Sequence, residues 1–337
     1  MKFDRDIYFG LLCGGKVRRA VAYLRQFPEK ASLAQRLERR MTQPPRLRTG
    51  SPWLNRVLSC FARYYQRLFW QGTTRQEGVC ILLEELCQLL EENGLAQPAE
   101  AADWKARTEQ GMEAAEERVA ARTEQEGYHY LGGETQGYFG PYVWKETKAE
   151  RYQVELPAGM QDFTVQMMDG FVSRSWLDFI SLGRIGAGGW ASGGQLFCVR
   201  KCYVKKLDKP AFQVFFLKHE AQHVYDMERY EGLTAVQLEY RAKLVELIYA
   251  PNISRFRMFL NEADRSDPEN SHAYASYLLV RNLSRLVFGE DYVPGYPRWK
   301  GKLAQIRRYS RVCYDAFPEM ELLLGENEKK RGNGHAV

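Results

Sequence analysis

His219-Glu220-Ala221-Gln222-His223 is the stretch of this 337-residue sequence on which both its fold and its function depend. Residues four apart lie on one face of a helix, so both imidazole rings can reach a single metal ion. Upstream, Lys209-Pro210 favours a helix start with Asp208 as its N-cap, and Gly232 favours a stop. The stretch therefore predicts a helix that carries two metal ligands.

The turns before the histidines are apolar, because they contain Phe212, Phe215 and Phe216. We therefore expect the helix to be buried. Histidines in an apolar interior need polar partners, and a metal ion is one such partner. The alternative is a core helix with two neutral, hydrogen-bonded histidines.

Composition indicates a folded globular protein, with 45% hydrophobic and 13% aromatic residues. No apolar run approaches the roughly 18 residues of a membrane span, and the first residues do not fit a secretory signal. Seven scattered cysteines suit reduced thiols better than a disulfide framework. We expect a cytoplasmic protein without a membrane partner.

Charge is distributed unevenly over the amino-terminal part of the chain. Residues 1–75 carry a net charge of +12 and residues 76–127 a net charge of −9. Solvated helical faces of opposite sign explain this most simply. Aromatic residues between the arginines could bind nucleic acid, but they share an apolar helical stripe, so we expect packing instead and no nucleic-acid partner. They are Tyr64, Tyr65, Phe69 and Trp70.

The pattern of apolar residues predicts an α+β protein with a helical region over residues 1–127. A second domain, with a small β-sheet and a pair of helices that carries the candidate metal ligands, is expected over residues 128–325. A disordered tail, which includes His335, is expected over residues 326–337. The predicted helical segments are 54–69, 79–90 and 100–122, and the predicted strands are 152–156, 163–167 and 196–204.

The glycine-rich residues 183–191 lack the Gly-Lys-Ser/Thr of a phosphate loop. They fit the dinucleotide pattern G-x-G-x-x-A, but a strand and not a helix is expected after them, so a dinucleotide site is not expected. We expect a flexible turn beside the cleft, with Trp190 in contact with substrate. Cys198 and Cys202 would lie roughly 13 Å apart on one strand, too far to share an ion, so buried free thiols are expected.

A second helix offers a third metal ligand. Thr234 and Gln237 form a capping box that predicts its start, and Glu239 and Glu246 then lie on one face. Catalytic zinc commonly takes three protein ligands and a water molecule. We expect Glu239 as the third ligand and Glu246 as an outer partner or an ion-pair partner. The alternative for Glu239 is a solvated helix glutamate.

His219-Glu220-x-x-His223 followed by Glu239-x-x-Ala242 resembles the gluzincin metallopeptidases, which include the thermolysin-like enzymes. The resemblance covers about 40 residues. It implies a zincin-like domain with an active-site helix pair over residues 128–325. It also implies zinc bound by His219, His223 and Glu239, with Glu220 as general base. The thermolysin-like pattern has an aspartate where this chain has Lys243. Asp226 is a candidate replacement for it, and also an alternative third ligand.

A zinc peptidase also needs a donor for the developing oxyanion. His272 and Tyr274 are candidates, Tyr249 is a third, and a loop histidine without a role is the alternative. The expected function is a zinc metallopeptidase in which Glu220 takes a proton from water held at the zinc. The other hypotheses are a non-catalytic protein that binds a metal, a nucleic acid or a protein partner and has a basic helical amino-terminal segment, and hydrolysis of a non-peptide amide. The sequence leaves the oligomeric state open.

Overall fold

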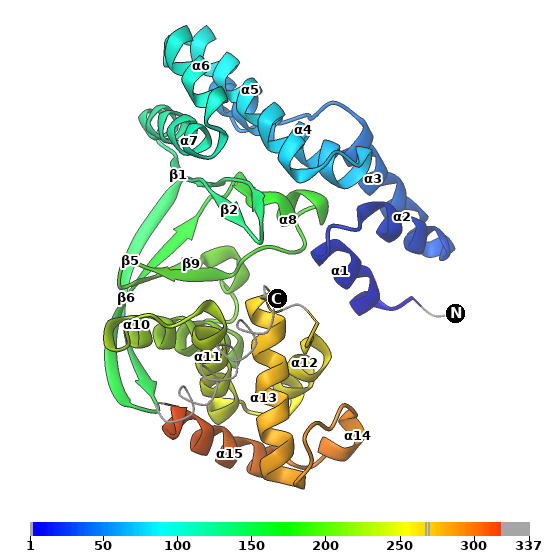
Figure 1. The fold of residues 1–337 in the computed structure, drawn as a ribbon, viewed down its shortest axis with the longest axis vertical. Coiled ribbons are helices and arrows are strands. Elements are labelled where there is room, and N and C mark those ends of the chain that lie inside the picture. Colours follow the sequence, from blue (N-terminus) through cyan, green and yellow to red (C-terminus); the bar gives the residue numbers. More distant parts are fainter. Residues whose placement is uncertain (1–2, 267, 269, 318–337) are drawn as a thin grey trace, which may run out of the picture. The chain divides into compact units, whose positions relative to one another are not determined.

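The computed structural model describes residues 3–266, 268 and 270–317 (Figure 1). Helices dominate and the strands gather in small sheets, so the expected α+β class is confirmed. The chain separates into two compact units. Unit 1 comprises Met1–Thr147 and Met168–Ala187, and unit 2 comprises Lys148–Met167 and Gly188–Val337. The predicted helical region 1–127 lies wholly within unit 1, whereas the predicted tail lies outside the described residues.

Unit 1 is built mainly of helices around one apolar core. Ser51 is the N-cap of the helix predicted over residues 54–69, because its hydroxyl accepts a hydrogen bond from the backbone N–H of Leu54. Tyr64, Tyr65 and Phe69 are buried, as expected from packing. The helices are α1 Arg5–Cys13, α2 Val17–Arg25, α3 Ala31–Thr42, α4 Pro52–Gln66, α5 Arg75–Glu92, α6 Pro98–Ala106, α7 Thr108–Gln125 and α8 Ser175–Ile180.

The prediction of one long solvated helix over residues 100–122 is wrong. Two helices, α6 and α7, occupy this region, and the chain leaves helical geometry at Arg107. Gly111 permits the tight turn, since a Cβ there would collide with the backbone of Trp104. Met112 and Val119 of α7 are fully buried, so this segment contributes to the core.

Short strands follow the helices of unit 1. β1 His129–Leu131, β4 Tyr142–Trp144 and β7 Ser173–Arg174 form an antiparallel sheet with β4 in the middle. β2 Glu134–Thr135 and β3 Tyr138–Phe139 form a separate pair.

Unit 2 holds a four-stranded sheet in the order β5-β6-β9-β8. The predicted strands 152–156 and 163–167 are confirmed inside β5 Glu146–Leu156 and β6 Gly159–Asp169. The third predicted strand is too long, because β9 Gln195–Val199 ends where a 3-10 turn begins at Arg200. The strand spacing assumed for Cys198 and Cys202 therefore does not apply. Cys198 is a buried thiol as expected, whereas Cys202 is only half-buried because it lies in the 3-10 turn.

The edge strand β8 Gly189–Ser192 lies in the stretch that the sequence suggested was a flexible turn, so that prediction is wrong for these residues. Trp190 of β8 pairs with Phe197 of β9, and their rings stack with centroids 5.7 Å apart. A Cβ at Gly189 would collide with the Phe197 carbonyl and the Phe216 ring. Glycine therefore allows β8 to approach both its neighbouring strand and the helix behind it.

The helices of unit 2 surround α11, which carries nine buried residues and packs on α10, α13 and α15. Figure 1 shows these helices beside the long β5–β6 pair. They are α9 Pro210–Phe212, α10 His219–Arg229, α11 Ala235–Tyr249, α12 Ser254–Glu262, α13 Ser271–Phe288, α14 Tyr296–Trp299 and α15 Leu303–Asp315, and the π-helical segment η4 Gln213–Lys218 joins α9 to α10.

Candidate metal centre

Helix α10 has a different start from the one predicted. Lys209, not Asp208, is the N-cap of α9, and Asp208 instead forms an exposed ion pair with Lys209 at 2.6 Å. The chain then widens into the π-helical segment η4 immediately before His219. Such segments are frequent at functional sites because they shift the side chains that follow. α10 ends at Arg229, three residues before Gly232.

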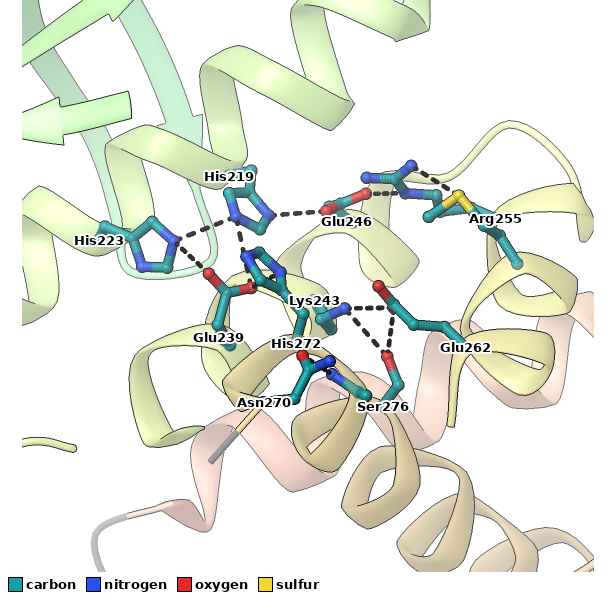
Figure 2. A network of polar contacts seen from close by, with 12 residues as sticks. His219, His223, Glu239, Lys243, Glu246, Arg255, Glu262, Asn270, His272 and Ser276 are labelled. Carbon is teal, nitrogen blue, oxygen red and sulfur yellow. Dashed lines mark hydrogen bonds and ion pairs between the residues drawn. The ribbon is translucent and has the colours of Figure 1, made fainter. Parts of the chain in front are cut away.

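Three side chains from two helices converge in unit 2, as Figure 2 shows. The Nε2 atoms of His219 and His223 lie 3.1 Å apart. Glu239 places Oε1 3.4 Å from His223 Nε2 and Oε2 3.8 Å from His219 Nε2. One ring nitrogen of each histidine and one carboxylate oxygen of Glu239 lie within 4.8 Å of one another. The capping box of Thr234 and Gln237 is present and starts α11, the helix that carries Glu239.

These separations suit a small tetrahedral cation. Zinc binds nitrogen and oxygen at about 2.0–2.2 Å, which places adjacent ligand atoms roughly 3.3 Å apart. The three contacts of 3.1, 3.4 and 3.8 Å bracket that value. Nδ1 of His223 is buried and has no hydrogen-bond partner among the described residues. The donor set of two imidazoles and one carboxylate therefore fits zinc and leaves a fourth position for another ligand.

Glu246 holds the ring of His219 from its far side. Its Oε1 lies 2.7 Å from His219 Nδ1, and its other oxygen accepts a hydrogen bond from Arg255. Glu246 is completely buried. A carboxylate at Nδ1 fixes the tautomer whose Nε2 lone pair points toward a metal. Glu246 thus has the outer-partner position expected from its spacing after Glu239.

Charges in the metal-free site are set by these contacts. Burial lowers the pKa of His219, but the hydrogen bond to Glu246 and the neighbouring carboxylates outweigh it and raise the pKa to about 9. Burial raises the pKa of Glu239, yet its contacts with His223 and His272 bring it well below the ordinary value. The site therefore keeps an ionised carboxylate beside a protonated imidazole, which a metal ion must deprotonate on binding.

Asp226 does not belong to this group. It accepts hydrogen bonds from Gln222 Nε2 and Arg241 Nε, both at 2.8 Å, in the fully buried packing of α10 against α11. The rings of Tyr314 and Phe317 lie within 4.6 Å of the Arg241 guanidinium. Neither role expected for Asp226, outer partner or third ligand, matches these contacts.

Lys243 occupies the position where the thermolysin-like pattern has an aspartate. Its ammonium group is buried and lies 2.6 Å from Glu262 Oε2 and 2.9 Å from Ser276 Oγ. These contacts join α11 to α12 and α13 (Figure 2). Lys243 therefore stabilises the helix that carries Glu239, while Glu246, three residues further on, takes the orienting role.

Glu220 is half-buried beside His219, and among the described residues its carboxylate has no hydrogen bond or ion pair. Burial raises the pKa of Tyr203, with smaller contributions from two cysteines and from the Glu220 carboxylate, so the Tyr203 phenol stays protonated. Tyr203 packs against Phe212 of α9 and Phe216 of η4. Sequence patterns did not indicate Tyr203, because its place depends on a 3-10 turn and not on a periodic spacing.

The remaining predicted site residues have different surroundings. His272, at the start of α13, is exposed and lies with Nδ1 2.9 Å from Glu239 Oε2. Tyr274 packs on Tyr277, and the ring of Tyr249 lies 4.0 Å from Lys218 Nζ. Trp190 is on the edge strand β8. Of the three candidate oxyanion donors, the structure places His272 beside the metal-ligand group.

No known family, no curated protein and no solved structure matches this chain. Its candidate metal centre is therefore characterised by its own geometry.

Proposed function

We propose that this protein is a zinc-dependent metallopeptidase. The observation that carries the proposal is the convergence of His219, His223 and Glu239 on one point, with Glu246 orienting His219. Three protein ligands with an open fourth position are typical of catalytic zinc, whereas structural zinc usually has four. The resemblance to gluzincins rests on the same residues.

A zinc ion held there supplies Lewis acidity, which lowers the pKa of coordinated water to about 7. Glu220 is adjacent to His219 on α10 and has no competing partner among the described residues, so its carboxylate is available to accept a proton. The same carboxyl group then returns the proton to the departing amine. His272, with Nδ1 2.9 Å from Glu239 Oε2, or the phenol of Tyr203 would donate a hydrogen bond to the developing oxyanion.

An extended peptide is the substrate class that the sheet supports best. β8 is the last strand in its sheet and lies against α10, so one of its edges has no strand partner among the described residues. Such an edge can hydrogen-bond an extended backbone as an added strand. Trp190 on this strand would contact a substrate side chain.

Metal content and cleavage together test the proposal. We expect one zinc per chain by elemental analysis and cleavage of a peptide library followed by mass spectrometry. Glu220→Gln should keep the zinc but lose activity by about 10²–10⁴-fold, since the amide cannot accept a proton. Glu228→Gln, an exposed change on the same helix, is the matched control. Zinc binding with equal cleavage in both variants would reject Glu220 as the base.

A structural zinc site is the second candidate, because of His272. Its Nδ1 lies 2.9 Å from Glu239 Oε2, close enough for the side chain to turn toward a metal as a fourth protein ligand. Four protein ligands would close the site and leave no position for water.

A further inference from the structure

A continuous arginine surface lies on unit 1, distinct from the metal centre. Two hollows of about 640 and 290 Å³ share Pro45, Arg46 and Leu47 in their walls, so they form one surface. We name as the arginine surface the seven arginines that line them: Arg36, Arg39, Arg40, Arg46, Arg48, Arg56 and Arg63.

Local structure explains why these side chains gather. Arg36, Arg39 and Arg40 have the helical spacing that places them on the exposed face of α3, opposite the buried Leu37. Residues 43–50 then run without helix or strand, in keeping with Pro44-Pro45, and expose Arg46 and Arg48 on either side of Leu47.

Arg56 and Arg63 complete the surface from α4, where they lie two turns apart. Three segments of the chain thus present arginines to the same hollows. Because the apolar residues of these segments are used in the core of unit 1, the guanidinium groups remain at the surface.

Most of this positive charge is not neutralised. Glu85 and Glu92 are the two acidic residues in the walls, and they pair with Arg63 and Arg56. Arg36, Arg46 and Arg48 have no hydrogen bond or ion pair through their side chains within the described part of the chain. With seven arginines and two glutamates, the walls have a net charge of +5.

The residue type narrows the chemistry of the partner. Thirteen of the sixteen basic residues among positions 1–75 are arginines. A guanidinium group presents a planar fork that donates two hydrogen bonds to one phosphate, whereas lysine acts as a point charge. Several forks along one surface suit a ligand with phosphates at regular intervals.

Aromatic side chains have little part in these walls. Tyr64, Tyr65 and Phe69, which are interleaved with basic residues in the sequence, are buried in the core, and Trp70 is half-buried against it. Phe179 is the one aromatic residue in the described walls, and it is half-buried with the Arg40 guanidinium 5.0 Å from its ring centroid. Binding would therefore be to the backbone and independent of base sequence. We propose that the arginine surface binds the phosphodiester backbone of a nucleic acid.

Salt-dependent binding tests this with the full chain. We expect a fluorescein-labelled 30-nucleotide RNA, the matching DNA strand and the DNA duplex to bind in fluorescence anisotropy, and the three probes separate RNA from DNA. The variant Arg36→Gln/Arg46→Gln/Arg48→Gln should bind at least tenfold more weakly at 150 mM salt. The slope of log affinity against log salt should fall by about 2 to 3, since each lost phosphate contact removes about 0.7–0.9.

The control removes the same charge from elsewhere on unit 1. Arg107→Gln/Arg118→Gln/Arg122→Gln breaks exposed or half-exposed ion pairs on α6 and α7, outside the arginine surface. We expect this variant to keep both affinity and slope. The variant Arg36→Lys/Arg46→Lys/Arg48→Lys keeps the charge and should bind with intermediate affinity, because the fork is lost.

Several outcomes would overturn the proposal. They are equal weakening by the two glutamine variants, absence of binding at 50 mM salt, and tighter binding to vesicles with 30% phosphatidylserine than to all three probes. Circular dichroism and zinc content should be unchanged in every variant. Glu220→Gln should bind the probes normally, so failure here is separate from failure of the proposed peptidase.

Discussion

Glu246 Oε1 lies 2.7 Å from Nδ1 of His219, and Nε2 on the opposite side of the same ring faces His223 and Glu239. One buried carboxylate on α11 therefore sets the direction in which a histidine of α10 offers its lone pair. Arg255 in turn fixes this carboxylate. The five predictions below depend on this site and on the helix packing that supports it.

Glu246→Gln should weaken zinc binding by about 10–100-fold, because His219 loses the carboxylate that fixes its tautomer and orientation. Competition against a chromophoric chelator measures the affinity. Glu228→Gln, an exposed substitution on α10, serves as the control and should leave the affinity unchanged. Equal affinity in Glu246→Gln and the native protein would show that His219 does not need this partner.

Zinc affinity should fall as the pH is lowered below about 9. The pKa of His219 is raised to about 9 in the metal-free protein, so zinc must displace a proton at neutral pH. The expected change is about tenfold per pH unit. Calorimetry in buffers of different ionisation enthalpy should detect release of about one proton. Constant affinity between pH 7 and 9 would contradict the raised pKa.

The raised pKa of His219 also affects the stability of the metal-free protein. This pKa of about 9 exceeds the ordinary value of 6.5, so the folded state binds the proton more tightly than the unfolded chain does. The stabilisation from this group is therefore complete below pH 6.5 and is lost as the pH rises toward 9. Urea unfolding of the chelator-treated protein across this range measures it. A free energy of unfolding that rises over this range would contradict the prediction.

His272→Ala separates catalytic zinc from structural zinc. We expect the variant to retain one zinc per chain and to lose roughly 10²–10³-fold in kcat, as for the removal of a hydrogen-bond donor near the reacting carbonyl. His272→Gln, which keeps a donor, should restore part of the rate. Loss of zinc in both variants would instead identify His272 as a fourth ligand and favour the structural site.

Asp226→Asn should destabilise the protein by about 3–5 kcal/mol, since it leaves the buried guanidinium of Arg241 without its counter-charge. The double variant Asp226→Asn/Arg241→Met should recover part of this loss, because no buried charge remains. Urea unfolding measures the free energies. Zinc affinity should change little in the double variant, as Asp226 is not a member of the metal-ligand group. Additive losses would show that the two residues do not interact.

The sequence predicted elements well where local chemistry decides them. The capping box of Thr234 and Gln237 satisfies backbone donors within four residues, so α11 begins where expected. Prediction failed where a contact distant in sequence or an unusual turn intervenes. The break between α6 and α7 depends on Gly111 meeting Trp104, and the short β9 on a 3-10 turn.

What the sequence determined by itself is the spacing of His219, Glu220 and His223, because helical periodicity places both imidazoles on one face. It also indicated Glu239 and Glu246 through the same periodicity on the next helix. The tertiary structure decided which carboxylate serves which purpose. Asp226 accepts hydrogen bonds from Arg241 and Gln222, and Glu246 is hydrogen-bonded to His219. A buried charge must be paired, and only the packing of the helices determines which partners lie within reach.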